Sequence, residues 1–316
     1  MLRTVGMDKP LINRSLTDIL QAHQAWLENR PEGVQADLSG LSLNDLRLEG
    51  KVLQRALLRR TTWLDSDLSG CDLSGVDLEG ADLRSTVMIG TDLTGANLTG
   101  TQLDFAVLAT ACLADARLVE TSLRRANLRE ARLQDAQLSR CDLTSAHARG
   151  AAFHHARLYD CCFHQADLER ATFLHARIHI CRFVAAAAPD ANFSSASIRD
   201  SEFTGVEMDR ARFREADLSG SDFGRCSLVD ADFREAKLAG ADFSQASLEN
   251  ALFRGANLFT ADLRSAALRG ARELTSGQLA QARTSETTIL PNGARGPYLK
   301  NSGAERPAPR RKPAIE

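Results

Sequence analysis

Residues 67–83 have the sequence DLSGCDLSGVDLEGADL, in which leucine recurs every five residues. An Asp precedes each of these leucines, and Ser-Gly or Glu-Gly follows most of them. Neither the 3.6-residue period of an α-helix nor the two-residue period of a β-strand divides into five. The stretch therefore predicts a repeat architecture of its own, which must be understood before any other feature.

The five-residue register extends far beyond this stretch. Counted in fives from Leu38 to Leu268, the central position holds Leu, Ile or Phe without insertion or deletion, apart from Trp63, Met88, Ala148, Ala188 and Met208. The residue two places earlier is almost always small, and the exceptions lie near the N-terminal edge: Leu41, Leu46 and Lys51. The remaining positions are mostly polar or Gly, which suits solvent and turns.

The pattern A-(D/N)-L-x-x over residues 36–270 resembles the pentapeptide-repeat family. The resemblance implies a right-handed quadrilateral β-helix, in which four repeats form one square coil, the central residue points inward and the small residue fills the corner. Stacked coils would pair their backbones. The expected fold is an all-β solenoid of about twelve 20-residue coils, with an N-terminal capping helix and a short C-terminal helical cap.

The phenylalanines support a 20-residue coil. When the central positions are sorted by a period of 20, all but two of the 13 Phe residues fall into two columns. One column runs from Phe153 to Phe253 and the other from Phe163 to Phe243. We expect two ladders of offset-stacked rings on opposite faces of the interior. The N-terminal half is filled by Leu instead.

The segments before the repeat are expected to be a flexible N-terminus, residues 1–14, and a capping helix within residues 15–35. The apolar residues after Ser15 follow helical spacing, Ser15 is a suitable N-cap, and Asp18 completes an approximate capping box. The apolar face of this helix must bury against something. We expect it to cover the open β-edge of the first coil.

The segments after the repeat are expected to be a C-terminal cap, residues 271–291, and a disordered tail, residues 292–316. Residues 274–282 can form a short helix, with Leu274 and Leu279 facing inward. The tail is rich in Pro, Gly and Arg and has no periodicity.

Within the repeat, one corner departs from the pattern. Ala188 stands where a large residue is expected, and Pro189 follows it. Because Pro cannot donate a hydrogen bond to a ladder, a thinned or bulged corner is expected there.

Composition and motifs favour a protein that is not an enzyme. The chain lacks a nucleophile elbow, a phosphate-binding Gly-rich loop and an HExxH motif, so we predict no catalytic residues and no cofactor. No apolar run reaches the length of a membrane span, and residues 1–10 lack the apolar core of a signal peptide. We therefore expect a cytoplasmic protein without membrane contact.

Cysteine and histidine raise the question of a metal site. Five of the seven Cys occupy the small interior position, which fits buried apolar packing better than a disulfide or a metal site. Six of the seven His lie between His147 and His179, and the 20-residue spacing would place His155 beside His175. A zinc site is one interpretation; exposed histidines or a pH-sensitive contact surface are simpler. We predict no metal site.

Charge is unevenly distributed although the formal net charge is only −2. Residues 65–104 and 199–249 are strongly acidic, whereas residues 117–182 are rich in Arg. Such bands can dock partners of complementary charge, or they can simply keep the surface soluble.

Two groups of residues are candidates for protein binding. The first places apolar side chains where the repeat normally has polar ones: Val87, Ile89 and Val107. The second combines Arg, aromatic and apolar side chains on a neighbouring face: Arg157, Tyr159, Arg177, His179 and Ile180. Aromatic and Arg residues beside apolar ones are typical of binding hot spots. Ordinary variation of the surface is the alternative for either group.

These observations favour a non-enzymatic, protein-binding rod. The family resemblance extends this to a bacterial toxin-neutralising (immunity) protein or a secretion-system effector adaptor. The alternative is a DNA mimic that inhibits or protects a type II topoisomerase, although the basic band interrupts the acidic surface that such mimicry needs. Direct nucleic-acid binding through that band and Arg310–Lys312 is weaker because acidic bands flank it. A homodimer is compatible with the sequence.

Overall fold

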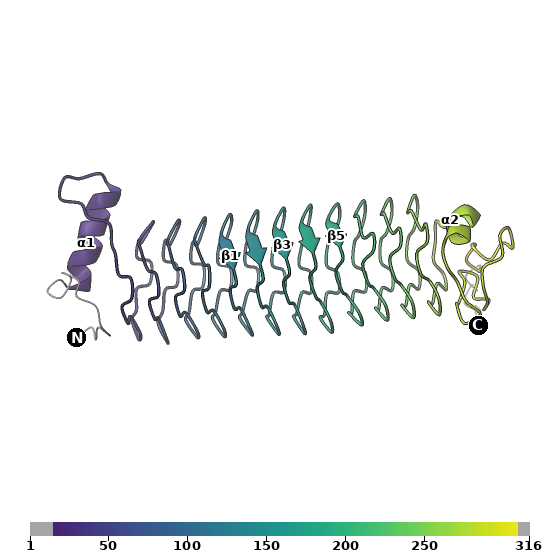
Figure 1. The fold of residues 1–316 in the computed structure, drawn as a ribbon, viewed down its shortest axis with the longest axis horizontal. Helices are drawn as coiled ribbons and strands as arrows, with labels where there is room; N and C mark the ends of the chain where they lie inside the picture. The colour runs from purple at the N-terminus through teal and green to yellow at the C-terminus, as the bar shows by residue number, and fades with distance from the viewer. Residues whose placement is uncertain (1–14, 309–316) are drawn as a thin grey trace, which may run out of the picture. The chain divides into compact units, whose positions relative to one another are not determined.

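The computed structural model of the protein describes residues 15–308. The chain falls into two compact units, Met1–Thr172 and Phe173–Glu316, and each is considered by itself. In both units the chain winds into stacked coils (Figure 1). Residues pair in parallel with the residue 20 positions further on, so four five-residue repeats make one coil. The predicted parallel β-solenoid is confirmed.

The first unit begins with helix α1, Leu16–Leu27, which is followed by the coils. Most coils pair through single bridges, and three pair through short strands: β1 (Arg117–Val119), β2 (Gln137–Ser139) and β3 (Arg157–Tyr159). These three strands are parallel and in register. The backbone ladder is continuous; for example, the Leu38 N–H donates to the Leu57 carbonyl at 2.9 Å.

The second unit contains the parallel pair β4 (Arg177–His179) and β5 (Ser197–Arg199), further bridged coils, and helix α2, Ser276–Gln281. Its bridges keep the 20-residue register as far as the pair Leu252 and Arg272. The last parallel bridges, Asp262 to Arg283 and Ala267 to Ile289, depart from that spacing in the C-terminal cap.

Central residues and the small residues two places before them form the interior. Almost all of them are fully buried in both units. Where the small residue is Ser, Thr or Cys, its side chain donates to a main-chain carbonyl, in most cases one of the preceding coil. Thr91 Oγ1 lies 2.8 Å from the Leu68 carbonyl, and Cys71 Sγ lies 2.8 Å from the Leu48 carbonyl. A buried hydroxyl or thiol is thus tolerated because it has a hydrogen-bond partner.

The phenylalanines of the second unit form the two predicted ladders. Along a ladder the rings are stacked; Phe183 and Phe203 have centroids 4.4 Å apart and planes within 6°. Between the ladders the rings meet edge to face, with Phe193 and Phe203 at 6.1 Å and 89°. Column sorting predicted the stacking, but it did not predict the edge-to-face contact. Both arrangements suit the charge distribution of aromatic rings.

Every coil corner requires a left-handed residue. From Gly40 to Gly270 the second residue after each central position has a positive φ, whether or not it is glycine. The Asp or Asn before the central residue supports the turn at many corners, because its Oδ1 accepts the N–H two residues later. Examples are the bonds from Ser69 N–H to Asp67 (2.9 Å) and from Thr94 N–H to Asp92 (2.9 Å). The Asp and Asn residues of the repeat thus have a structural role.

The corner at Pro189 is regular, contrary to the expected thinning or bulge. Ala187 keeps its bridge to Glu207, and the Ala188 N–H donates to the Glu207 carbonyl at 2.7 Å. Pro189 occupies the turn position whose N–H elsewhere bonds to an Asp side chain rather than to the ladder. Pro therefore removes no ladder bond here. Ala187, at the position that holds Asp or Asn at many other corners, needs no side-chain acceptor because Pro189 has no N–H.

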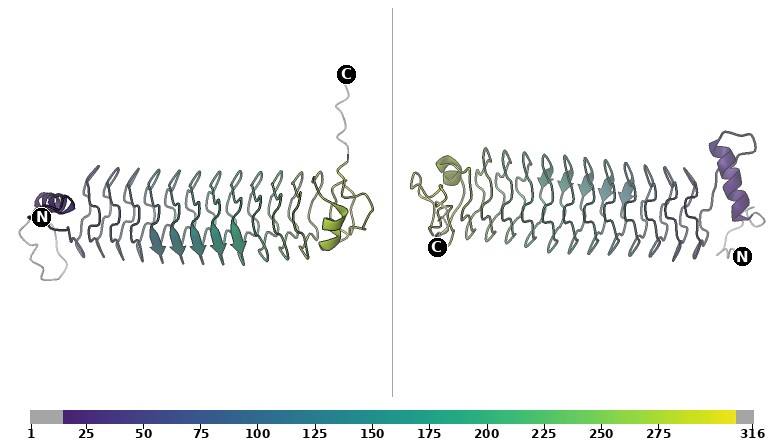
Figure 2. Two further views of the ribbon diagram at one scale, coloured as in Figure 1. Left: turned by 90° about the horizontal axis from the view of Figure 1, so that it is seen from above. Right: turned by 180° about the vertical axis from the view of Figure 1, so that it is seen from behind.

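Helix α1 lies beside the first coil, as Figure 2 shows from two further directions. Ser15 and Asp18 form the predicted capping box. His23 is fully buried: its Nδ1 accepts the Ala36 N–H at 3.1 Å, and its ring stacks on Trp26 at 5.5 Å. Gly33 packs directly against the backbone of Trp26, where a Cβ would clash. The helix is therefore joined to the coils by specific contacts, as a cap should be.

The C-terminal cap forms around α2, which is shorter than predicted. Gln278 closes its capping box with Thr275 and also donates to the carbonyls of Phe253 and Ala256 at 2.8 and 2.9 Å. Leu279 is buried as expected. The side chain of Gln278 thus satisfies carbonyls that no further coil covers.

The predicted disorder of residues 292–316 is wrong for residues 292–308, and residues 309–316 lie outside the described part of the chain, as do residues 1–14. The Tyr298 hydroxyl bonds to Ser276 at 2.8 Å and to Glu305 at 2.9 Å, and the Asn292 N–H donates to the Ala304 carbonyl at 3.2 Å. Composition predicted disorder because the segment has no periodicity, but these contacts to and within the cap order it without any.

Truncation of one rung in the Phe ladders should be costly. Phe203 is fully buried and contacts Phe183, Phe193 and Phe223. We expect Phe203→Ala to lower the free energy of unfolding by about 3–5 kcal/mol, because the cavity is lined by rigid rings. Phe203→Leu, which retains much of the volume, should cost clearly less. Denaturant titration of both variants checks this, and equal losses would contradict it.

Acid should loosen the N-terminal cap. Burial lowers the pKa of His23, opposed by the Gln54 backbone, and Nδ1 must stay unprotonated to accept the Ala36 N–H. The stability that neutral His23 contributes is therefore present above the ordinary histidine pKa of about 6.5, and it is lost as pH falls below that value. Hydrogen exchange of the α1 amides should accelerate below this pH. In His23→Gln that acid-dependent step should disappear; if it persists, another group is responsible.

Candidate protein-binding surface

The first predicted group lies together in the first unit. Val87 and Val107 are bridge partners on adjacent coils, and both are half-buried. Ile89, at the next corner, has 47% of its surface exposed. Each Val occupies the position before the centre, which holds Asp or Asn at many other corners. Val87 and Val107 are therefore on one face of adjacent coils, and that these three residues bind a partner stays a prediction.

Phe105 belongs to the same surface, and sequence reasoning missed it. Its side chain is 53% exposed, and its backbone is left-handed with φ of 63°. The Arg125 guanidinium lies 5.7 Å from the centroid of the ring. A large apolar residue at this left-handed position is a usable signal in the sequence, because Gly and polar residues dominate there.

The valines change the hydrogen bonding of the main chain. Elsewhere the Asp or Asn before the centre accepts the N–H two residues on, but Val87 and Val107 have no acceptor to offer. Within residues 15–308, the N–H groups of Ile89 and Ala109 have no hydrogen-bond partner. Two backbone donors therefore stand beside the apolar side chains, satisfied only by solvent or by a bound molecule.

A buried carboxylate supports the corner that carries Phe105. Asp104 is almost fully buried and accepts bonds from Ser122 and from the Arg124 guanidinium, the latter at 2.7 Å. Burial by itself would raise the pKa of Asp104, but the bonds from Arg124 and Ser122 outweigh it and hold that pKa below its usual range. Arg124 is thus committed within the protein, in contrast to Arg125, which lies over the Phe105 ring.

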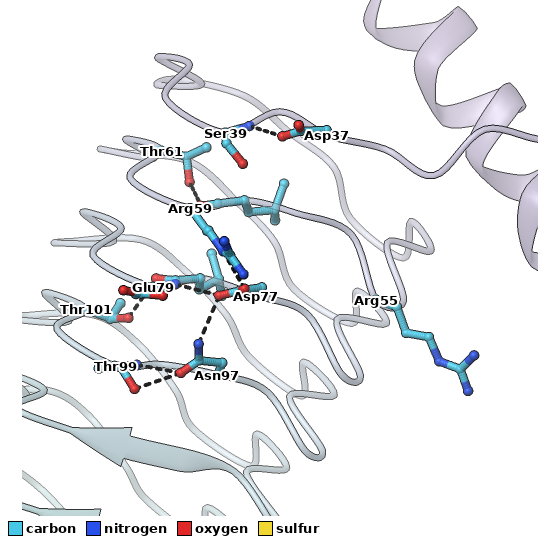
Figure 3. A network of polar contacts seen from close by, with 12 residues as sticks. Asp37, Ser39, Arg55, Arg59, Thr61, Asp77, Glu79, Asn97, Thr99 and Thr101 are labelled. Atoms are coloured by element: carbon cyan, nitrogen blue, oxygen red, sulfur yellow. Dashed lines mark hydrogen bonds and ion pairs between the residues drawn. The ribbon is translucent and has the colours of Figure 1, made fainter.

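The acidic band near the N-terminal end of the coils is internally bonded. Figure 3 shows Asp77 between Arg59, at 2.6 Å, and Asn97, whose amide donates at 3.0 Å. Arg55 points away from this network. Arg84 likewise pairs with Asp82 at 2.6 Å, and this pair lowers the pKa of Asp82. Part of the negative charge in this band is therefore offset by neighbouring Arg residues.

The second predicted group is divided between the two units. Arg157 and Tyr159 are exposed on β3 of the first unit, with Tyr159 at 48%. Arg177 and His179 are exposed on β4 of the second unit, and Ile180 follows them at 41%. That the five residues form one cluster stays a prediction.

Ile180 is conformationally unusual. Its φ is 56°, in the left-handed region, where a β-branched side chain is strained. Beside it, His179 Nε2 lies 3.0 Å from the Asp200 carboxylate. An exposed apolar side chain in a strained turn is a reason to look for a role on the surface.

The cysteines and histidines form no evident centre of chemistry. In residues 15–308 all seven Cys are free thiols, and no group of three or more His, Cys, Asp and Glu side chains is placed to hold a metal ion. Burial raises the pKa of the Cys226 thiol to about 12. His154 bonds to Thr172 at 2.6 Å. The described helices are too short and too polar to cross a bilayer.

Comparison with solved structures finds several similar chains. HetL, a protein involved in heterocyst differentiation regulation from the cyanobacterium Nostoc sp. strain PCC 7120, is 24% identical, over 90% of this chain and 100% of HetL, with a TM-score of 0.28. A pentapeptide repeat protein from the thylakoid lumen of Arabidopsis thaliana is 27% identical; the match covers 31% of this chain and 68% of that protein, with a TM-score of 0.26. QnrB1, a plasmid-mediated fluoroquinolone resistance protein, is 18% identical; the match covers 77% of this chain and 93% of QnrB1, with a TM-score of 0.23.

Sequence models of one family match most of the repeat region. The model described as Pentapeptide repeats (8 copies) matches residues 36–75, 65–100, 101–136, 111–144, 136–173, 226–264 and 236–272, and the Pentapeptide repeat region model matches residues 156–233. A comparison with curated protein sequences finds no match. The matched residues are those whose five-residue register builds the coils, and the chain belongs to the pentapeptide-repeat family.

Proposed function

We propose that this protein is a non-enzymatic scaffold that binds a partner protein through the outer faces of its coils. The observation that carries the proposal is the surface of Val87, Ile89, Phe105 and Val107 in the first unit. Val87 and Val107 stand where Asp supports the turn at other corners, and Phe105 occupies a left-handed corner. Such substitutions weaken the coil locally, so a contact outside the chain is the simplest reason to retain them.

Within this proposal, the protein acts in the cytoplasm as a toxin-neutralising (immunity) protein or as a secretion-system effector adaptor. Both roles need a rigid surface and no chemistry. A backbone paired coil to coil supplies rigidity, and the residues that face outward can vary without disturbing the interior.

The second candidate is a DNA mimic that inhibits or protects a type II topoisomerase. The acidic band from Asp65 to Asp104 favours it. Against it, Arg59 and Arg84 pair with Asp77 and Asp82 within that band, and residues 117–182 are rich in Arg. Mimicry of duplex DNA requires a long, uninterrupted negative surface, so we rank it below protein binding through the apolar surface.

The two candidates differ in their partner and in the residues used. A photo-crosslinking amino acid placed at position 107, with a matched one at Asp115 on another face, should trap one stoichiometric protein from position 107 only. Trapping from both positions or from neither would contradict binding at this surface. If the protein inhibits or protects purified gyrase, and the Val107→Asp variant does so equally well, the second candidate is favoured.

The second predicted group is tested by charge and by strain. Arg157→Glu and Arg177→Glu should each weaken binding of the trapped partner if these faces take part; unchanged affinity would exclude them.

Ile180→Gly should raise the free energy of unfolding by about 0.5–1 kcal/mol, since relief of left-handed strain exceeds the added chain entropy of Gly. Loss of partner binding together with this gain in stability would assign Ile180 to the contact. A less stable variant would show that its turn is not strained.

A further inference from the structure

We infer that the surface formed by Val87, Ile89, Phe105 and Val107 binds a partner segment that alternates apolar and acidic side chains. The inference rests on the proposed function and specifies the chemistry of the partner. It depends on three features of the first unit: an apolar centre, unsatisfied backbone donors, and Arg side chains on one side only.

The apolar centre is continuous across two adjacent coils. Val87 and Val107 are parallel bridge partners, so their side chains stand one coil apart on the same face. Phe105 stands at the corner before Val107, and Ile89 at the corner after Val87, with 53% and 47% of their surfaces exposed. A strand spacing of about 4.8 Å gives this centre the dimensions of two or three apolar side chains of an extended segment.

Backbone donors lie beside that centre. The N–H groups of Ile89 and Ala109 have no hydrogen-bond partner within residues 15–308, because Val87 and Val107 replace the usual Asp or Asn acceptor. A bound segment that supplies carbonyl or carboxylate oxygens would satisfy them. Any extended segment offers main-chain carbonyls, but among charged side chains only Asp and Glu add acceptors for these N–H groups.

The charges around the centre are asymmetric. On the following coil Arg125 and Arg129 are exposed, and neither forms an ion pair within residues 15–308. The Thr110 N–H donates to the Arg129 carbonyl at 2.8 Å, which places Arg129 one coil from the corner after Val107. On the preceding coil Asp67 is the bridge partner of Val87. Two unpaired guanidinium groups on one side therefore favour a carboxylate there.

The surface also has the composition of a binding site rather than of a tolerated irregularity. Arg125 lies over the Phe105 ring, so the cation and the aromatic face are held together before any partner arrives. The nearby Arg124 is held by buried Asp104 and cannot neutralise a bound carboxylate. Arg125 and Arg129 are thus the cations available to an acidic side chain.

The test uses a fluorescein-labelled peptide, Gly-Ser-Leu-Asp-Leu-Glu-Leu-Asp-Gly-Ser, and fluorescence polarisation with the full chain. Two matched peptides carry Lys in place of the acidic residues or Ser in place of Leu. We expect the acidic apolar peptide to bind at least about tenfold more tightly than either matched peptide. Its affinity should fall as salt is raised, because the pairing of charges is exposed.

Four variants decide the site. Phe105→Gly places glycine at a left-handed corner and Val107→Asp restores the usual turn acceptor, so both should fold at least as stably as the natural chain. Each should nevertheless reduce affinity for the acidic apolar peptide about tenfold, and Arg125→Ser should do the same. Asp115→Gly, at another left-handed corner with φ of 57°, is the control and should change nothing.

The outcomes separate this inference from the proposed function. Three results would overturn the inference. The Lys peptide could bind as tightly as the acidic peptide or more tightly, or the acidic peptide could fail to bind at concentrations on the order of 1 mM. The third is that Phe105→Gly and Val107→Asp bind the acidic peptide as tightly as the natural chain does. If the crosslinker at position 107 still traps a partner protein, the surface is a binding site and only its assigned chemistry is wrong. If nothing is trapped there, the proposed function fails at this surface as well.

Discussion

The parallel pairing of each residue with the one 20 positions later is the constraint on which the rest of the structure depends. It can be maintained only if every repeat has the same length and every corner turns in the same way. Leu38 and Leu57 illustrate the result: main-chain bonds run from coil to coil in a single register. An insertion of one residue would shift the inward positions of the repeats that follow out of register with the neighbouring coil, and the register runs unbroken from Leu38 to Leu268.

This register separates the residues that build the fold from those that can be used for recognition. The central residue and the small residue before it are buried and leave little freedom of choice. The residue preceding the centre is intermediate, because Asp or Asn there supports the turn, as Asp67 does for Ser69. When Val87 or Val107 takes this position, the ladder survives and only the turn loses an acceptor. Surface chemistry can therefore change at a small local cost, without rearrangement of the interior.

The sequence predicted most of the fold and part of the candidate surface. Period, column sorting and capping signals identified the coils, the Phe ladders and helix α1, because each depends on local spacing. The regular corner at Pro189 was not anticipated, since the unused N–H at that turn position becomes apparent only from the hydrogen-bond pattern. The ordered segment 292–308 was missed for a similar reason: Tyr298 is held by Ser276 and Glu305 through tertiary contacts that leave no periodic trace. Val87, Ile89 and Val107 were found as departures from the pattern, whereas the sequence prediction did not include Phe105, although it departs from the pattern in the same way as Ile180.

For this protein the amino-acid sequence by itself determined the five-residue register, the division into inward and outward positions, and membership of the solenoid class, because a strict repeat allows few ways to bury one large and one small apolar residue. The tertiary structure alone decided how outward side chains on adjacent coils meet. Phe105 and Arg125 are 20 residues apart, and only the stacking of coils places the guanidinium over the ring. It also decided which backbone donors go unsatisfied, since the N–H of Ile89 lacks a partner only because the neighbouring turn offers no acceptor.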